Sequence, residues 1–190
     1  MAVPQNFSSW NLKVLIPAGI FGFLVGWFTA SMISEKMVTL LIGLMGVIFC
    51  LNIWLRKKSI QHPNKPKVLS GLFWGTLSGF TSFISHSGAP PFQVFVLPQK
   101  LQKLVFAGTA TLVFAVINLA KIIPYQDLQP YTANDLRSAL VLIPFAIGGT
   151  YLGAILTKKI PDALFFTLVQ IALFGVSLKL IWGTKDIFFY

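Results

Sequence analysis

The chain has 190 residues, of which 55% are hydrophobic and only 11% are charged, and its formal net charge is +10. Soluble domains carry about 25% charged residues, so this composition excludes an ordinary soluble protein and indicates a membrane protein. The positive charge does not call for a nucleic-acid partner, because the basic residues lie mainly at the ends of apolar runs, as the positive-inside rule predicts.

The first two apolar runs cover residues 12–33 and 37–55. Each is close to the roughly 20 residues that a helix needs to cross the hydrocarbon core of a bilayer. The first run is longer than the roughly 7–15 apolar residues of a signal peptide, and it has no clear basic start. We therefore predict two transmembrane helices here, rather than a cleaved leader.

A basic stretch, KKSIQHPNKPK, follows at residues 57–67. Clusters of Lys and Arg between spans are typical of cytoplasmic loops. Three further apolar runs lie at residues 104–123, 138–157 and 163–182. The sequence therefore predicts an all-α, polytopic protein of the cell (inner) membrane, with residues 57–67 as a basic cytoplasmic loop.

The segment 68–97 is apolar at both ends, but its middle reads SHSGAPP. Gly88 can adopt a positive φ, and prolines are tolerated only in the first turn of a helix. We expect one helix to end near residues 85–86 and a short second helix to start at Pro90 or Pro91. Non-helical backbone at membrane depth must be buried in protein or line a cavity, so the pattern predicts a broken or re-entrant helix.

Hydrogen-bond donors gather at this break. Ser85 and Ser87 carry hydroxyl hydrogens, His86 carries a ring N–H, and the second helix begins with free N–H groups and a positive dipole end. The apolar runs contain no Asp or Glu, so the pattern favours a small anion, as at the discontinuous helices of secondary transporters. The candidate substrate-binding residues are Ser82, Ser85, His86, Ser87, Gly88, Pro90, Pro91, Gln93 and Thr109.

Two other interpretations of the break stay open. It could be a simple turn between helices, with His86 as a surface or core histidine. It could also be an enzyme centre with His86 as a base beside Ser85 or Ser87, although adjacent residues on a turning backbone point apart and no third residue orients the histidine. The sequence has no metal-ligand cluster and no phosphate-binding loop, so we expect no cofactor, no metal and no enzymatic activity.

The chain also contains an internal repeat. A shift of 127 residues aligns residues 14–33 with residues 141–160, so that the letters VLIP coincide and Gly22 and Gly26 meet Gly149 and Gly153. This predicts two homologous helical repeats, at residues 1–56 and 68–190. About 70 residues precede VLIP in the second unit but only 13 in the first, so we expect the first repeat to be truncated at its start.

The orientation of the repeats depends on residues 68–97. If this segment enters and leaves the membrane on one side, each repeat crosses an odd number of times and the two repeats are inverted. If it crosses once, they are parallel. The Lys and Arg residues divide equally well in both arrangements, and the short apolar stretch after the break is too brief to cross alone, which favours inversion.

Residues 75–109 resemble the second-half signature of the sulfite exporter TauE/SafE family. The resemblance rests on the order and spacing of Phe80, Ser82, His86, Gly88, Pro90, Pro91, Pro98, Gly108 and Thr109, while Ala89 stands where a second glycine is common. It implies a multi-pass exporter of small sulfur-containing or organic anions, such as sulfite, sulfonates or thiosulfate. As partners we expect the small anionic substrate, the lipid bilayer and a second copy of the chain. Family members usually carry a broken helix in the first half too, so a truncated, non-transporting subunit is the alternative.

Overall fold

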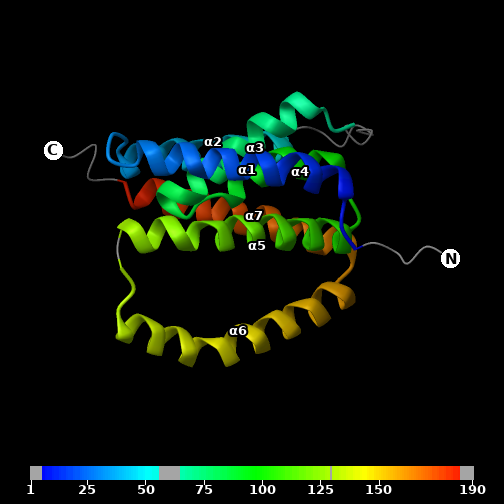
Figure 1. Ribbon diagram of the computed structural model, residues 1–190. Coiled ribbons are helices and arrows are strands. Elements are labelled where there is room, and N and C mark those ends of the chain that lie inside the picture. Colours follow the sequence, from blue (N-terminus) through cyan, green and yellow to red (C-terminus); the bar gives the residue numbers. More distant parts are fainter. Residues whose placement is uncertain (1–5, 56–64, 129, 185–190) are drawn as a thin grey trace.

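The computed structural model describes residues 6–55, 65–128 and 130–184 (Figure 1). Within these residues the chain forms seven α-helices and one short 3-10 helix, and no strand. The predicted loop 57–67 lies mostly outside the described residues. The helices are α1 (Ser9–Thr29), α2 (Glu35–Leu55), α3 (Val68–Ser85), α4 (Ala89–Val96), α5 (Lys103–Leu128), α6 (Ala133–Lys159) and α7 (Asp162–Trp182), and the 3-10 helix is η1 (Leu97–Gln99).

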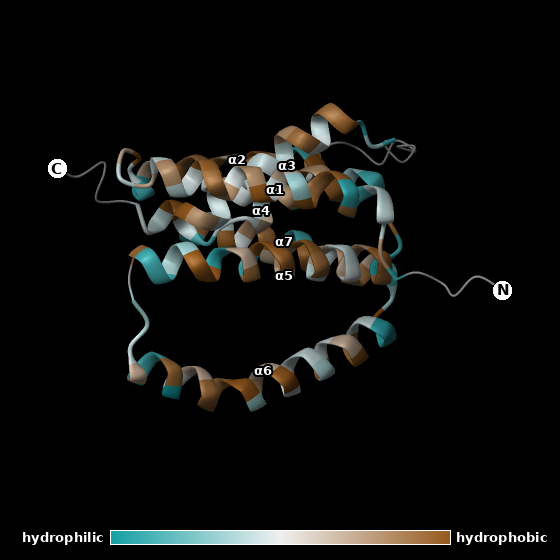
Figure 2. Cartoon of the chain, in the orientation of Figure 1, coloured by the Kyte–Doolittle hydropathy of each residue, from teal (hydrophilic) through white to brown (hydrophobic). Residues whose placement is uncertain are grey.

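Six of these helices, all except α4, are long and apolar enough to cross a membrane. Figure 2 shows hydrophobic colouring along most of their length, with hydrophilic residues near the helix ends and in the connections. The all-α, multi-pass membrane fold that composition predicted is therefore confirmed. The five predicted spans each correspond to one helix, and α3 is the sixth.

Two helix boundaries differ from the predicted apolar runs, one at a proline and one at an N-terminal cap. Helix α5 continues past Pro124 to Leu128, instead of ending at residue 123. Helix α6 begins at Ala133 because Thr132 and Asp135 form a capping box, each bonding the backbone N–H of the other. Both helices therefore carry polar residues further along their axes than the apolar runs indicated.

The segment from α3 to η1 enters and leaves at one end of the bundle. Its break contacts the last turns of α3, since Gly88 lies against Ser78 and Ser82. Phe95, near the end of α4, lies against Gly71, near the start of α3. Helix α4 thus runs back along α3, and the segment is re-entrant, as the sequence predicted for an inverted arrangement.

Helices α1 and α3 run side by side in the same direction and pack through small residues. Gly22 lies against the backbone of Thr76, and Gly79 lies against the backbone of Gly19; an added Cβ at either glycine would overlap these atoms. Small residues let two membrane helices approach until their backbones touch. This contact, with α5 behind it, forms the core around the re-entrant segment.

Helices α2 and α7 form a second, antiparallel pair. Gly43 lies against Ser177, and Cys50 lies against Gln170, whose carbonyl is 3.6 Å from the Cys50 sulfur. Trp54 donates its indole N–H to the Gln170 side chain at 3.0 Å. The pair extends the core beside α4 and α5.

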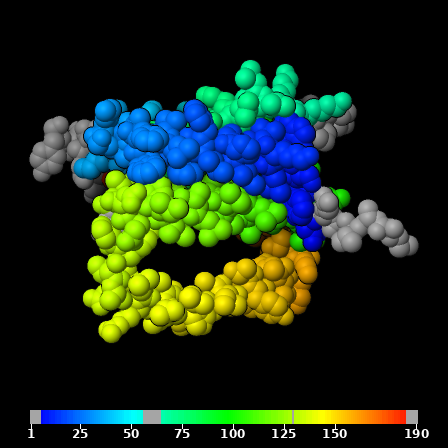
Figure 3. All heavy atoms as spheres, viewed as in Figure 1, coloured from blue at the N-terminus to red at the C-terminus, as the bar shows by residue number. Residues whose placement is uncertain are grey.

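Helix α6 stands apart from the other helices. In the space-filling view of Figure 3 an opening separates it from α5 along most of its length. No residue of α6, all of whose residues are described, is buried. Its C-terminal end is held by Lys103 of α5, which bonds the carbonyls of Lys158 and Ile160 and pairs with Asp162 at 3.3 Å.

Candidate functional site

The break between α3 and α4 lies where the sequence predicted it. Helix α3 ends at Ser85, and the next residue, His86, adopts a left-handed conformation with φ 51° and ψ 20°. Its backbone N–H bonds the carbonyl of Thr81, which is the usual closure of a helix C-terminus. Helix α4 then begins at Ala89 with Pro90 and Pro91 in its first turn, where proline is tolerated.

Gly88 is required here for close packing and not for a positive φ. Its φ is −75°, an ordinary helical value, so the left-handed residue of the break is His86. A Cβ at residue 88 would lie 2.7 Å from the carbonyl oxygen of Ser78 and 2.7 Å from the Cβ of Ser82. Glycine therefore lets the returning chain touch α3.

The hydroxyl groups near the break bond backbone carbonyls. Ser78 donates to the Gly88 carbonyl at 2.7 Å, and Thr81 donates to the Ser87 carbonyl at 3.1 Å. Ser85 donates to the Thr81 carbonyl at 3.2 Å, and Ser87 to the Ser85 carbonyl at 2.9 Å. These hydroxyls hold the turn closed in the membrane, where each carbonyl needs a partner. Neither serine beside His86 directs its hydroxyl to the histidine ring.

Two side chains of α5 complete the end of α3. Lys121 is 5% exposed, and its ammonium donates to both the carbonyl and the hydroxyl oxygen of Ser82 at 2.9 Å. Tyr125 donates its hydroxyl to the Phe83 carbonyl at 2.7 Å. The last carbonyls of a helix have no partner in the helix and carry its negative dipole end. Lys121 therefore brings a buried positive charge to the break.

Lys121 has no carboxylate partner among the described residues. Its nitrogen lies 5.9 Å from the centre of the Tyr125 ring, a cation–π distance. A buried charge without a counter-ion is costly inside a membrane and typically marks a functional site. An anion bound beside Ser82 would supply that counter-charge.

The N-terminus of α4 contributes less to an anion site than the sequence indicated. Pro90 and Pro91 have no N–H, so of the first three residues of α4 only Ala89 carries an amide hydrogen. The predicted cluster of free backbone donors therefore reduces to one. The positive character of the break comes mainly from Lys121.

A hollow of about 400 Å³ opens beside the break. His86, which is exposed, lies on its wall with its ring centre 5.6 Å from that of Tyr125. Pro130, Tyr131 and Asp135 complete the lining. The hollow thus lies beside His86 and Tyr125, the residues that flank the break on the side of the bundle end. Asp135, which lies outside the apolar runs, thus brings a carboxylate to the hollow, where its Oδ2 accepts hydrogen bonds from Thr132.

The remaining candidates divide by position. Gln93 lies one turn along α4, and its Oε1 is buried without a hydrogen-bond partner from the described residues. Thr109 is fully buried near the other end of α5, where it accepts from the Ser8 N–H at 2.9 Å and donates to the Val105 carbonyl at 2.6 Å. The structure therefore brings together Ser82, Ser85, His86, Ser87, Gly88, Pro90 and Pro91, with Gln93 beside them and Thr109 apart.

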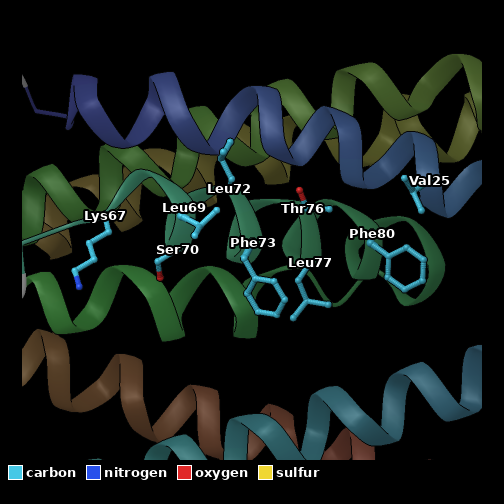
Figure 4. Close-up of a pocket in the computed structure, with 9 residues that line it drawn as sticks. All are labelled: Val25, Lys67, Leu69, Ser70, Leu72, Phe73, Thr76, Leu77 and Phe80. Atoms are coloured by element: carbon cyan, nitrogen blue, oxygen red, sulfur yellow. The ribbon is translucent and has the colours of Figure 1, made fainter.

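A larger cavity of about 810 Å³ lies on the outer side of α3. Figure 4 shows that its lining is mainly aliphatic and aromatic, with Leu69, Phe73, Leu77 and Phe80 along the helix and Lys67 at one end. It offers no cluster of donors, so it fits apolar chains and not a small anion. The described residues also contain no group of His, Cys, Asp and Glu that could hold a metal ion.

Sequence reasoning missed Lys121 and Tyr125. In the sequence Lys121 lies near the end of the apolar run 104–123, where a lysine can extend to the membrane surface. Pro124 led to a predicted helix end at residue 123, because a proline inside an apolar pattern usually marks a helix end. Placing both residues on a helix that continued past Pro124 would have put them on one face, since residues four apart are neighbours.

A family model, that of the sulfite exporter TauE/SafE, matches residues 4–180. No curated protein and no solved structure matches the chain. The family match spans almost the whole described bundle, including the re-entrant segment whose residues suggested the resemblance. The chain therefore belongs to the sulfite exporter TauE/SafE family.

Proposed function

We propose that the chain is a secondary transporter, an exporter of small anions such as sulfite, sulfonates or thiosulfate, and that the anion binds at the break between α3 and α4. The observation that carries the proposal is the buried charge of Lys121, which has no carboxylate partner among the described residues. A small anion needs such a compensating charge and a few hydrogen-bond donors when it leaves water.

In this proposal His86 and Tyr125 line the route from the hollow to the break, and Ser82 links the route to Lys121. The anion approaches His86 first. It then loses its bound water as it binds the ammonium of Lys121 and the hydroxyl of Ser82. Gln93 adds an amide group from α4. The remaining residues at the break, Ser85, Ser87, Gly88, Pro90 and Pro91, shape the turn that allows these groups to meet.

The proposed orientation places the basic ends of the helices in the cytoplasm of a cell (inner) membrane. Lys103, at the start of α5, bonds the carbonyl of Lys158, near the end of α6, so these basic residues share one end of the bundle. The hollow lies at the other end, beside Asp135. Under the positive-inside rule the hollow then opens outward, which suits the release of an exported anion.

The test uses the full chain in proteoliposomes loaded with sulfite, with the released sulfite measured over time. We expect flux above that of protein-free vesicles, at least a tenfold loss for Lys121→Met and His86→Ala, and retained flux for Lys121→Arg. Lys103→Met is the matched control, because Lys103 lies on the same helix at the opposite end. Added sulfonate or thiosulfate will slow sulfite release if these anions share the site.

A loss of flux is informative only for folded variants, so each variant is also checked for a single monodisperse peak and a thermal unfolding midpoint. Unchanged flux in Lys121→Met would remove the break from the mechanism. No flux from the native chain would instead favour the second candidate function, a subunit that does not transport by itself. The open face of α6 favours that candidate.

A further inference from the structure

The larger cavity on the outer side of α3 forms a groove along the helix, here called the α3 groove (Figure 4). Leu69, Phe73 and Leu77 recur every four residues, so they lie on one face of α3. Phe80 and Val25 of α1 lie at the far end of the groove. Its volume of about 810 Å³ is within the range of ligand pockets, about 300–1,000 Å³. None of its lining residues belongs to the proposed anion site at the break, so a ligand here is distinct from the transported anion.

The length of the α3 groove matches one leaflet of a bilayer. Eleven residue steps separate Leu69 from Phe80, and at about 1.5 Å per step they span about 17 Å. The hydrocarbon core is about 30 Å thick, so half of it is about 15 Å. Leu69 is 81% exposed and Phe73 is 60% exposed, so the groove is open on the side that faces lipid. An acyl chain that enters at one membrane surface and ends near the midplane therefore fits along it.

Two lysines stand where the α3 groove begins. Lys67 lines the groove, and together with Lys65 it also lines a second hollow of about 430 Å³ at the start of α3. Ser70 lines both cavities, so the two lie next to each other. Trp74 lies in the lining of the hollow, and tryptophan is enriched at the membrane interface. The polar hollow and the apolar groove thus follow one another in the order of a headgroup and its chain.

The lysines bring positive charge to this entrance without a balancing carboxylate. Neither Lys65 nor Lys67 has a carboxylate partner among the described residues, and no described Asp or Glu lines either cavity. Gly71 lies against Phe95, which places the start of α3 beside the end of α4, at the basic end of the bundle. In the orientation proposed above, this end faces the cytoplasmic leaflet, whose anionic lipids attract lysines near the membrane surface.

We infer that the α3 groove and the adjoining hollow together bind one anionic phospholipid. Its phosphate lies beside Lys65, Lys67 and Ser70, and one of its acyl chains lies in the groove. The two ammonium groups neutralise the headgroup, and the Ser70 hydroxyl is a donor for the phosphate oxygens. A zwitterionic phospholipid gains less, because its own ammonium group offsets the attraction of the lysines. A small free anion gains no contact with the apolar wall.

The test measures lipid binding to the full chain after its lipids have been removed in a neutral detergent. The chain is titrated with phosphatidylglycerol or with phosphatidylcholine of the same acyl chains, and native mass spectrometry counts the bound lipids and gives their affinities. Each lysine beside an anionic headgroup contributes about fivefold in affinity. We therefore expect one tightly bound phosphatidylglycerol, with an affinity about tenfold or more above that of phosphatidylcholine.

The headgroup contacts are tested with lysine variants. Lys67→Gln should lower the affinity for phosphatidylglycerol about fivefold and leave that for phosphatidylcholine nearly unchanged. Adding Lys65→Gln should remove most of the preference between the two lipids. Lys13→Gln is the matched control, because Lys13 is an exposed lysine at the start of α1 that lines neither cavity. We expect Lys13→Gln to keep the preference for phosphatidylglycerol.

The chain contacts are tested with a pair of phenylalanine variants. Phe73 in the groove and Phe21 on α1 are 60% and 61% exposed, and Phe21 does not line the groove. Phe73→Ala removes apolar contact with the acyl chain, so we expect it to weaken binding of both phospholipids about threefold or more. Phe21→Ala should leave both affinities nearly unchanged. Because both side chains are exposed, neither variant should prevent folding, and a single monodisperse peak checks this.

Four results would overturn the inference. Two are equal affinities of the native chain for the two phospholipids, and an unchanged preference in the double lysine variant. The third is displacement of bound phosphatidylglycerol by an equal concentration of glycerol phosphate, which would mean that the headgroup alone is recognised. The fourth is cross-linking between Phe73→Cys chains, made in a Cys50→Ser background, in vesicles of phosphatidylglycerol and phosphatidylcholine. A second copy, and not a lipid, would then cover the groove.

Discussion

Helices α1 and α6 share a sequence pattern but differ completely in burial. Leu15 of α1 is 1% exposed, whereas its repeat-equivalent Leu142 in α6 is 62% exposed. Both helices contain VLIP and two glycines spaced by four. The difference shows that the pattern encodes a face suited to close helix contact, and that a partner helix decides whether the face is buried.

The bilayer explains why one sequence can serve both environments. Exposed Leu and Phe side chains would destabilise a helix in water, but lipid tails are as apolar as those side chains, so packing and not hydrophobicity distinguishes the two helices. Helix α6 is therefore compatible with its exposed position in a membrane. The two glycines of α6 serve close contact with another helix, and contact with lipid does not require them.

The largest expected effect comes from filling the glycine face on the packed side. Gly79→Leu would force α1 and α3 apart, because even a Cβ at residue 79 overlaps the backbone of Gly19. We expect a loss of more than about 3 kcal/mol of the free energy of unfolding, seen as loss of the folded peak in size-exclusion chromatography. Gly153→Leu in the isolated chain should leave the unfolding midpoint nearly unchanged.

Equal destabilisation by the two leucine variants would contradict the comparison, since it would mean that α6 packs against another helix of the same chain. The tryptophan fluorescence of the chain reports both transitions, because Trp10, Trp27, Trp54, Trp74 and Trp182 are spread over the helices.

A smaller loss is expected at the break. Gly88→Ala places a methyl group 2.7 Å from the Ser78 carbonyl and 2.7 Å from the Ser82 Cβ, and a backbone carbonyl cannot move aside cheaply. We expect a destabilisation of about 2 to 3 kcal/mol, or a lower unfolding midpoint by about 2–4 °C for each kcal/mol. Gly148→Ala, with open space around it, is the control. An unchanged midpoint for Gly88→Ala would show that α4 does not need to touch α3.

The break itself was predictable from sequence, because Gly88, Pro90 and Pro91 restrict the backbone locally. Proline fixes its own φ and removes a donor whatever surrounds it, so the start of α4 could be located within a residue. Burial of Lys121 was not predictable in this way. It depends on which face of α5 meets α3, and this tertiary contact leaves no local pattern.

The left-handed residue was also beyond local reasoning. Glycine is the usual residue at such a position, yet the structure places His86 there and uses Gly88 for a close approach. Thr81, Lys121 and Tyr125 hold the end of α3 by hydrogen bonds, and together these contacts fix the backbone conformation of the turn. Strained backbone persists where the surroundings fix it, and it gathers at ligand sites.

A third variant compares the polar contacts that hold α5 to α3. Lys121→Met removes two hydrogen bonds and leaves the Ser82 carbonyl without its partner. We expect a loss of about 1 to 2 kcal/mol, since a buried unpaired carbonyl is costly but hydrogen bonds in membrane proteins are individually modest. Thermal unfolding in detergent measures it, and Lys121→Arg should recover most of the loss. A gain in stability for Lys121→Met would indicate that the charge is kept for a ligand alone.

The smallest effect is expected where α6 is attached to the bundle. Asp162→Asn removes the charge that pairs with Lys103, but the Asp162 side chain is 60% exposed and Lys103 keeps its bonds to the carbonyls of Lys158 and Ile160. Exposed ion pairs contribute little, so we expect a change below about 0.5 kcal/mol. Lys103→Met removes all of these contacts and should lower the unfolding midpoint more than Asp162→Asn does. If the two variants lowered the unfolding midpoint equally, the ion pair and not the carbonyl contacts would hold this end of α6. A single charged pair would then attach this end of α6 to the rest of the bundle.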